Sequence, residues 1–182
     1  MGRDFTLPSG SLNIQRMKSL VRPAPLPEFT IAHFACPGFW LQLKASDQKL
    51  LEIEFLSVTP PQILEPSSAV LHETTEQLRR WLANPAYLFT LPIQPYGTSF
   101  RQKVWAQIAA IPMGQTRSYG ELAKALHSAP RAVGQACGDN PLPIVTPCHR
   151  VVSQTGLGGF NHSSGQDLLG IKRWLLAREQ GK

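Results

Sequence analysis

SYGELAKALHSAPRAVGQAC, residues 118–137, predicts two short helices joined by a tight turn. Ser118 and Glu121 are spaced as a capping box, in which the serine and glutamate side chains each bind a backbone N–H group of the other residue. Ser128 is placed to cap the second helix, and Pro130 is tolerated in its first turn. Two short helices across such a turn are typical of a helix-turn-helix, a motif that can enter a groove of DNA.

The outward face of the second helix has few long side chains. It presents Arg131, Ala132, Gly134 and Gln135. Reading base edges in the major groove needs several long polar side chains, whereas small residues let a backbone approach the narrow minor groove. We therefore expect a sequence-tolerant contact with the minor groove. The competing interpretation, that Ala132 and Gly134 are only packing residues between helices, is equally compatible with the spacing.

The rest of the chain predicts an α+β fold. Residues 29–58 contain short runs of β-forming residues, which predict strands of one antiparallel sheet. The apolar residues over 68–83 have helical spacing. A further helix over residues 100–110 follows a capping-box match at Ser99 and Gln102, and a final helix carries one stripe of Leu168, Ile171, Leu175 and Arg178. We expect an irregular extension at 1–28, an α/β scaffold domain at 29–95, and a mostly helical domain with the helix-turn-helix at 96–182.

Cys148 follows the apolar run Ile144-Val145-Thr146 in the segment Pro147-Cys148-His149-Arg150, which places the thiol at the predicted end of a buried strand. Thiolates attack electrophiles, and cationic neighbours such as His149 and Arg150 lower the pKa of a cysteine. This favours a nucleophile. The alternative, a small buried apolar residue, is what most unpaired cysteines are, and these four residues alone do not decide between the two.

Polar residues near Cys148 in the predicted fold add to its chemistry. Asn140 sits in the turn before the apolar run, where its side chain can hold the backbone. Glu179 falls in the last turn of the final helix, where a carboxylate opposes the helix dipole unless a partner compensates it, and His149 is a candidate partner. Neighbouring residues of a strand point to opposite sides, so we expect a water between Cys148 and His149.

Composition narrows the class of protein. With 182 residues the chain can bury a core, and 18 Lys+Arg against 12 Asp+Glu give a formal net charge of +6, which favours a polyanionic partner such as nucleic acid. Three cysteines without the spacing of a disulfide scaffold favour a reducing compartment.

No apolar stretch approaches the roughly 20 residues of a membrane span, so we expect a cytoplasmic protein, or a nuclear one in a eukaryote. We expect no cofactor, and His33 with Cys36 is too sparse for a zinc site.

Five ordered segments together resemble one protein family. They are Tyr119–Ala123, Arg131–Gly134, Gly138–Pro141, Pro147–Val151 and Trp174–Glu179. In order and spacing they are similar to the O6-alkylguanine-DNA alkyltransferases, also called methylated-DNA–protein-cysteine methyltransferases, over about residues 97–179. The resemblance implies direct repair of double-stranded DNA by irreversible transfer of the alkyl group from O6-alkylguanine, and from O4-methylthymine, to Cys148. It also implies a small RNase H-like α/β domain before the helical one, and a monomer without an obligate protein partner.

The resemblance also assigns roles to individual residues. Arg131 would fill the base stack after the damaged base is flipped out, with Ala132, Gly134 and Gln135 along the DNA-binding face. Tyr119 would push the target nucleotide outward and donate a proton to the departing guanine, and Asn140 would hold the turn. Cys148, a water, His149 and Glu179 would form the activating relay. The substrate pocket would include Val151, Phe160 and Asn161, and the backbone near Val151 would accept hydrogen bonds from the exocyclic amine of the base.

Alternatives from other classes remain. A non-catalytic sensor of alkylated DNA would keep the helix-turn-helix and Arg131, but would not need the thiol. A cysteine hydrolase would use His149 as base and Asn140 as orienter, although a neighbouring His and Cys are not the usual remote pair. A departure from the commonest family pattern is the longer, more polar loop at residues 158–166, which leaves the width of the pocket and the accepted alkyl size open.

Overall fold

The computed structural model describes residues 29–93, 96–162 and 165–181; the extension expected at 1–28 lies outside these ranges. The first part is a three-stranded antiparallel sheet in the order β1 (Thr30–Cys36), β2 (Phe39–Ala45) and β3 (Leu50–Leu56). Alternate residues of β2 are buried, from Phe39 to Ala45, as a sheet with one face on the core requires. The predicted antiparallel sheet is confirmed.

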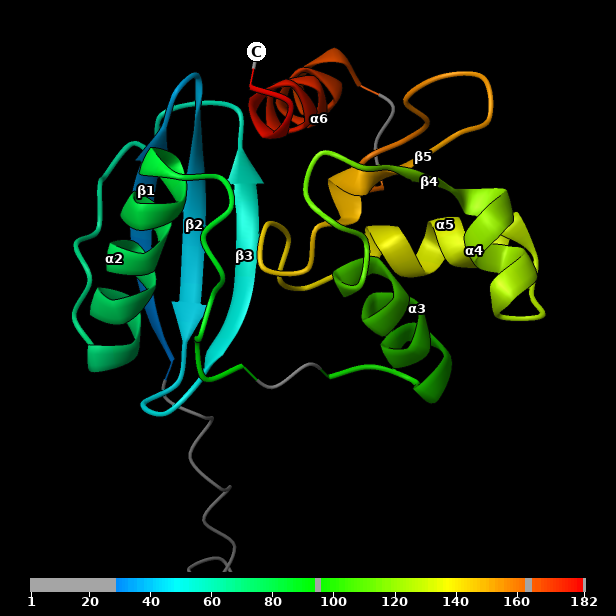
Figure 1. Ribbon diagram of the computed structural model, residues 1–182. Coiled ribbons are helices and arrows are strands. Elements are labelled where there is room, and N and C mark those ends of the chain that lie inside the picture. Colours follow the sequence, from blue (N-terminus) through cyan, green and yellow to red (C-terminus); the bar gives the residue numbers. More distant parts are fainter. Residues whose placement is uncertain (1–28, 94–95, 163–164, 182) are drawn as a thin grey trace, which may run out of the picture.

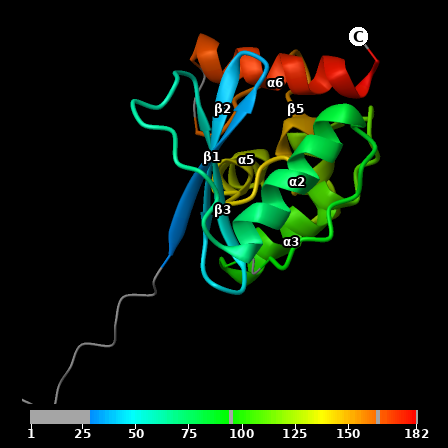
Figure 2. The same cartoon turned by 90° about the vertical axis from the view of Figure 1, so that its left-hand side faces the viewer.

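Helix α2 (Ala69–Ala83) packs against one face of the sheet (Figure 2). Ser68 caps it by accepting a hydrogen bond from the backbone N–H of Leu71, and its buried side chains include Leu78 and Trp81. The helix predicted over residues 68–83 therefore forms. The sheet and α2 together make the small α/β part of the predicted α+β fold.

The second part of the molecule is mostly helical, as predicted (Figure 1). It contains α3 (Ser99–Ala109), α4 (Tyr119–Ala125), α5 (Pro130–Gly138), a 3-10 helix η1 (Cys148–Arg150) and α6 (Gln166–Glu179). Two short parallel strands, β4 (Arg117–Ser118) and β5 (Val151–Val152), join the start of α4 to the segment after η1. Helices α4 and α5 pack together as the predicted helix-turn-helix, with Val133 and Cys137 buried.

Helix starts show where local sequence signals were sufficient and where they were not. The capping box of Ser118 and Glu121 forms with both of its hydrogen bonds. The box predicted at Ser99 and Gln102 is wrong, because Thr98 is the N-cap of α3 and its hydroxyl accepts the Arg101 N–H. Ser128 does not cap α5 either, since the helix starts after Ala129 with no side-chain cap.

Helix α6 connects the two parts of the molecule. Its Trp174 ring contacts Phe39 of β2 at 5.3 Å and Trp81 of α2 at 6.2 Å between centroids, in edge-on geometry. Arg178 lies over the Trp81 and Trp174 rings and donates to the backbone carbonyl of Leu82. The boundary between 29–95 and 96–182 stays a prediction, because α6 packs on both sides of it. No helix within the described ranges is long and apolar enough to cross a membrane.

Candidate active site

The turn before Cys148 is held by Asn140, as predicted. The Asn140 side-chain amide donates to the carbonyl of Thr146 at 2.8 Å, and its Oδ1 accepts from the backbone N–H of Leu142 at 3.1 Å. The strand predicted over residues 144–146 is wrong: Ile144 has a φ of 75° and the segment is a turn, with a bridge between Pro143 and Thr146. These residues are apolar because the turn is largely buried, not because it extends.

Cys148 is therefore the first residue of η1, with its backbone N–H bonded to Thr146 O at 2.8 Å. It is 5 % exposed, and burial raises the pKa of its thiol. A hydrogen bond with the Asn140 side chain and the charge of Lys172 oppose this shift. The expectation that Arg150 lowers this pKa is wrong, because the Arg150 guanidinium is directed to Glu179. At rest the sulfur is a protonated thiol, and a base must take its proton before it can attack.

His149 and Glu179 form a buried pair. His149 Nε2 lies 2.7 Å from Glu179 Oε1, and both side chains are almost fully buried. Arg150 donates to both carboxylate oxygens at 2.9–3.1 Å, and the backbone N–H of Gly114 donates to Oε2 at 3.1 Å. Burial would raise the pKa of Glu179, but the hydrogen bonds from His149 and Arg150 bring it to about 2. These groups compensate the carboxylate at the C-terminal end of α6.

The protonation state of His149 follows from this arrangement. Burial lowers the pKa of the imidazole, although Glu179 opposes the shift, so the ring is neutral near pH 7. An ionised Glu179 can only accept, and Nε2 therefore carries the hydrogen. The other nitrogen, Nδ1, is buried and has no hydrogen-bond partner in the described part of the chain. It is an open proton acceptor beside the residue that carries the thiol.

Lys172 of α6 belongs to this site, although the sequence analysis did not select it. Its side chain is fully buried, and Nζ donates to the carbonyls of Val151, Leu157 and Gly159 at 2.7, 2.6 and 3.0 Å. Burial lowers the pKa of Lys172 to about 8, against the influence of the two nearby cysteines. The signal was present in the sequence: position 172 lies between Leu168 and Leu175 on the apolar stripe of α6, where a lysine needs buried acceptors.

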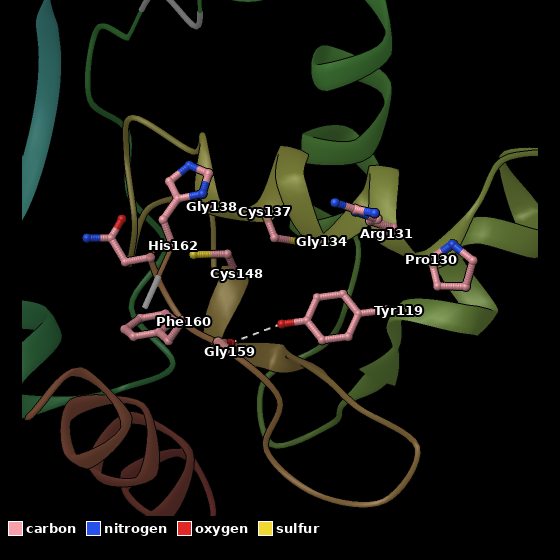
Figure 3. A pocket seen from close by; sticks show the side chains of 11 residues that line it. Tyr119, Pro130, Arg131, Gly134, Cys137, Gly138, Cys148, Gly159, Phe160 and His162 are labelled. Carbon is pink, nitrogen blue, oxygen red and sulfur yellow. Dashed lines mark hydrogen bonds between the residues drawn. The ribbon is translucent and has the colours of Figure 1, made fainter. Parts of the chain in front are cut away.

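Cys148 opens into a pocket of about 460 Å³ between α4, α5 and the loop after β5 (Figure 3). The Tyr119 hydroxyl donates to the carbonyl of Gly159 at 3.0 Å across its mouth, and burial, with the nearby cysteines, raises the pKa of the phenol. Of the predicted pocket residues, Phe160 and Asn161 line it, but Val151 does not: its carbonyl accepts from Lys172 instead. The lining residues are Tyr119, Pro130, Arg131, Gly134, Cys137, Gly138, Cys148, Gly159, Phe160, Asn161 and His162.

The predicted DNA-binding face lies at the rim of this pocket. Arg131 and Gln135 are exposed, Ala132 and Gly134 are partly buried, and Arg131 and Gly134 line the pocket. A Cβ added at Gly134 would stand 3.9 Å from the ring of Tyr119, an ordinary van der Waals distance, so the position faces Tyr119 of α4 and its glycine keeps the helix face bare. Cys137, which the sequence marks only as inward-facing, also lines the pocket, and burial raises its pKa to about 12.

Residues 99–181 match the family model of the 6-O-methylguanine DNA methyltransferase, DNA binding domain. A methylated-DNA–protein-cysteine methyltransferase of Archaeoglobus fulgidus is 40% identical over 108 residues, which are 59% of this chain and 74% of that protein. One from Methanosarcina acetivorans is 34% identical over 155 residues, 81% of this chain and 96% of that protein. The chain belongs to the methylated-DNA–protein-cysteine methyltransferases.

Solved structures agree with this family assignment. The crystal structure of the Mycobacterium tuberculosis O6-methylguanine methyltransferase matches with a TM-score of 0.71 and 30% identity, over 85% of this chain and 94% of that one. The Mycobacterium tuberculosis OGT in complex with DNA matches with a TM-score of 0.67 and 32% identity, over 83% and 92%. The predicted family and fold class are confirmed, and the small sheet part is included in the similarity to the methyltransferases. The roles of individual site residues stay predictions.

Proposed function

We propose that this chain repairs double-stranded DNA by moving the alkyl group of O6-alkylguanine, and of O4-methylthymine, onto its own Cys148. One observation carries the proposal: a buried thiol opens into a pocket whose rim is the bare face of a helix-turn-helix. A stacked base cannot reach a sulfur inside such a pocket, so the damaged nucleotide must rotate out of the duplex. Arg131 is exposed at the rim, and in this proposal its side chain fills the vacated place in the stack.

The attacking thiolate requires a proton acceptor, and His149 supplies it. The thiol proton passes through a water to Nδ1, and Glu179 stabilises the resulting imidazolium through Nε2. The sequence predicted this water from the alternation of side chains along a strand, and that reason does not hold because Cys148 and His149 lie in a 3-10 helix. The water is proposed here because His149 Nδ1 is buried without a hydrogen-bond partner in the described part of the chain. The charge of Lys172 also favours the thiolate.

Transfer forms a sulfur–carbon bond while the bond between the alkyl carbon and O6 breaks. The bonding electron pair stays on the purine, which takes up one proton, matching the proton lost by the thiol. Tyr119 is the donor at the pocket mouth. Its hydroxyl must leave the carbonyl of Gly159 to donate this proton. The phenolate left behind then takes up a proton from water, and the imidazolium of His149 releases one, so the protons balance.

The S-alkyl cysteine that results is a thioether and a very poor leaving group. Each molecule therefore acts once. We also propose that it acts as a monomer without an obligate protein partner. Incubation with a duplex carrying O6-methylguanine, followed by mass spectrometry of the digested protein, tests this directly. We expect one added methyl group at Cys148 per restored base, and none in Cys148→Ala.

Cys36→Ala is the matched control, because Cys36 lies on β1 away from the pocket and should leave transfer unchanged. Binding to the damaged duplex with no modification of Cys148 would instead identify a sensor. Turnover of an ester or peptide without DNA would identify a hydrolase. Repeated repair by one molecule would contradict the permanent thioether.

A further inference from the structure

A second cleft, of about 430 Å³, lies beside the pocket of Cys148. The two share one wall, formed by Gly138, Asn161 and His162. The far side of the second cleft is polar and includes residues of strand β3. None of the roles that the family resemblance assigns falls on this sheet. It is lined by Glu52, Ile53, Glu54, Tyr96, Gly97, Arg101, Gly138, Asp139, Asn140, Pro141, Asn161 and His162.

The imidazole of His162 forms part of the shared wall. A Cβ placed on Gly138 would stand 2.5 Å from two atoms of this ring, so the imidazole lies directly on the glycine at the end of α5. Only a residue without a side chain permits that contact. The backbone at Asn161 and His162 has φ values of 48° and 58°, a left-handed conformation that costs energy for both residues.

A hydrogen bond to Asp139 holds the ring in place. His162 Nε2 lies 2.8 Å from Asp139 Oδ1, and the other carboxylate oxygen lies 2.5 Å from Arg101 Nη2 of α3. The Asp139 side chain is 17% exposed, whereas that of His162 is 46% exposed. The ring can therefore swing outward without unpacking the core, while Asp139 and Arg101 stay where they are.

The direction of the Cys148 sulfur makes this wall important for the size of the alkyl group. Figure 3 shows the Cys148 sulfur directed to the side of the pocket where His162 and Phe160 lie, opposite Tyr119. In a displacement, the attacked carbon lies between sulfur and O6, so the other atoms of a larger substituent must extend sideways into the walls around the sulfur. A methyl group needs no such space, and a longer chain does.

We propose that His162 is a partition that sets the alkyl size this enzyme accepts, and that the second cleft receives the end of long, hydrophilic O6-alkyl chains when the ring moves. This rests on the proposed function. The occupant is a hydroxyalkyl arm and not an apolar one, because most of the residues that line the cleft are charged or polar. The sheet domain thereby supplies one side of the substrate site.

Single-turnover rates on two duplexes test the proposal, one with O6-methylguanine and one with O6-(4-hydroxybutyl)guanine. In His162→Ala we expect the ratio of the hydroxybutyl rate to the methyl rate to rise about tenfold or more, within the range that pocket size can discriminate. Asp139→Asn should raise the same ratio by a smaller factor, because a neutral amide replaces the carboxylate that binds the ring. His162→Gln, which can still donate to Asp139, should stay near the wild-type ratio.

His72→Ala is the matched control, since His72 is exposed on α2 and should change neither rate. Equilibrium unfolding in urea shows that each variant is folded, and the ratio of the two rates is compared whatever their absolute size. An unchanged ratio in folded His162→Ala would overturn the partition and leave the proposed function intact. Absence of methyl transfer to Cys148 in the wild-type protein would overturn the proposed function itself.

Discussion

Replacing Lys172 with methionine removes a buried charge but keeps nearly the same side-chain length. The ammonium donates to the carbonyls of Val151, Leu157 and Gly159. Leu157 is half-buried and Gly159 is exposed, so water can replace the lysine at these carbonyls, whereas Val151 is completely buried. The variant should therefore leave one dry carbonyl unpaired and lose two further bonds that water partly replaces.

The magnitude follows from these three bonds. An unpaired buried carbonyl costs about 1–3 kcal/mol, and each bond exchanged for one to water costs about 1 kcal/mol. The pKa of Lys172, lowered to about 8, shows that burial of the ammonium has its own cost, which the variant no longer has. We expect a net loss of about 2 kcal/mol in the free energy of unfolding. The alkyl-transfer rate should fall about tenfold or more, because a cation that favours the Cys148 thiolate is gone.

Equilibrium unfolding in urea and single-turnover transfer measure the two effects. Lys103→Met is the control: this lysine is exposed on α3, so the variant loses the same charge without the buried contacts and should remain within about 0.5 kcal/mol of the wild type. Lys172→Met with the stability and rate of that control would refute the argument. The loop after β5 would then be held by its own turns and by Tyr119.

Three other substitutions have separate outcomes. Glu179→Gln should cost about 3 kcal/mol in unfolding free energy at pH 7, because it leaves Arg150 and His149 without their anion. Since the pKa of Glu179 is depressed from 4.5 to about 2, its contribution is complete above pH 4.5, and the difference from wild type should shrink as the pH falls from there towards 2; a constant difference would show that no carboxylate charge is involved. Tyr119→Phe should lower the transfer rate more than DNA affinity, and an unchanged single-turnover rate would remove its role as proton donor. Arg131→Ala should slow repair in duplex far more than reaction with the free modified base, and equal losses in the two assays would contradict a role in base flipping.

Local signals predicted those features that depend on neighbouring residues. The capping box at Ser118 and Glu121 forms because its two partners are three residues apart. The hydrophobic pattern gave a wrong prediction at Ile144 to Thr146, because it predicts a strand where the structure has a turn. Burial explains the apolar residues equally well, and the left-handed φ of Ile144, enforced by the Asn140 bonds to each side of the turn, cannot be seen in a hydrophobic pattern.

The electrostatics of the site were harder to predict because they arise from contacts distant in sequence. Sequence proximity suggested that Arg150 would lower the pKa of Cys148, but η1 turns its guanidinium to Glu179, which is 29 residues away. The cation that does oppose the raised pKa is Lys172, on the apolar stripe of the final helix. A charged residue on an apolar stripe is therefore a stronger indication of a site than a charged neighbour in the chain. It can remain buried only if the fold brings acceptors to it, and here those acceptors belong to the loop that closes the pocket.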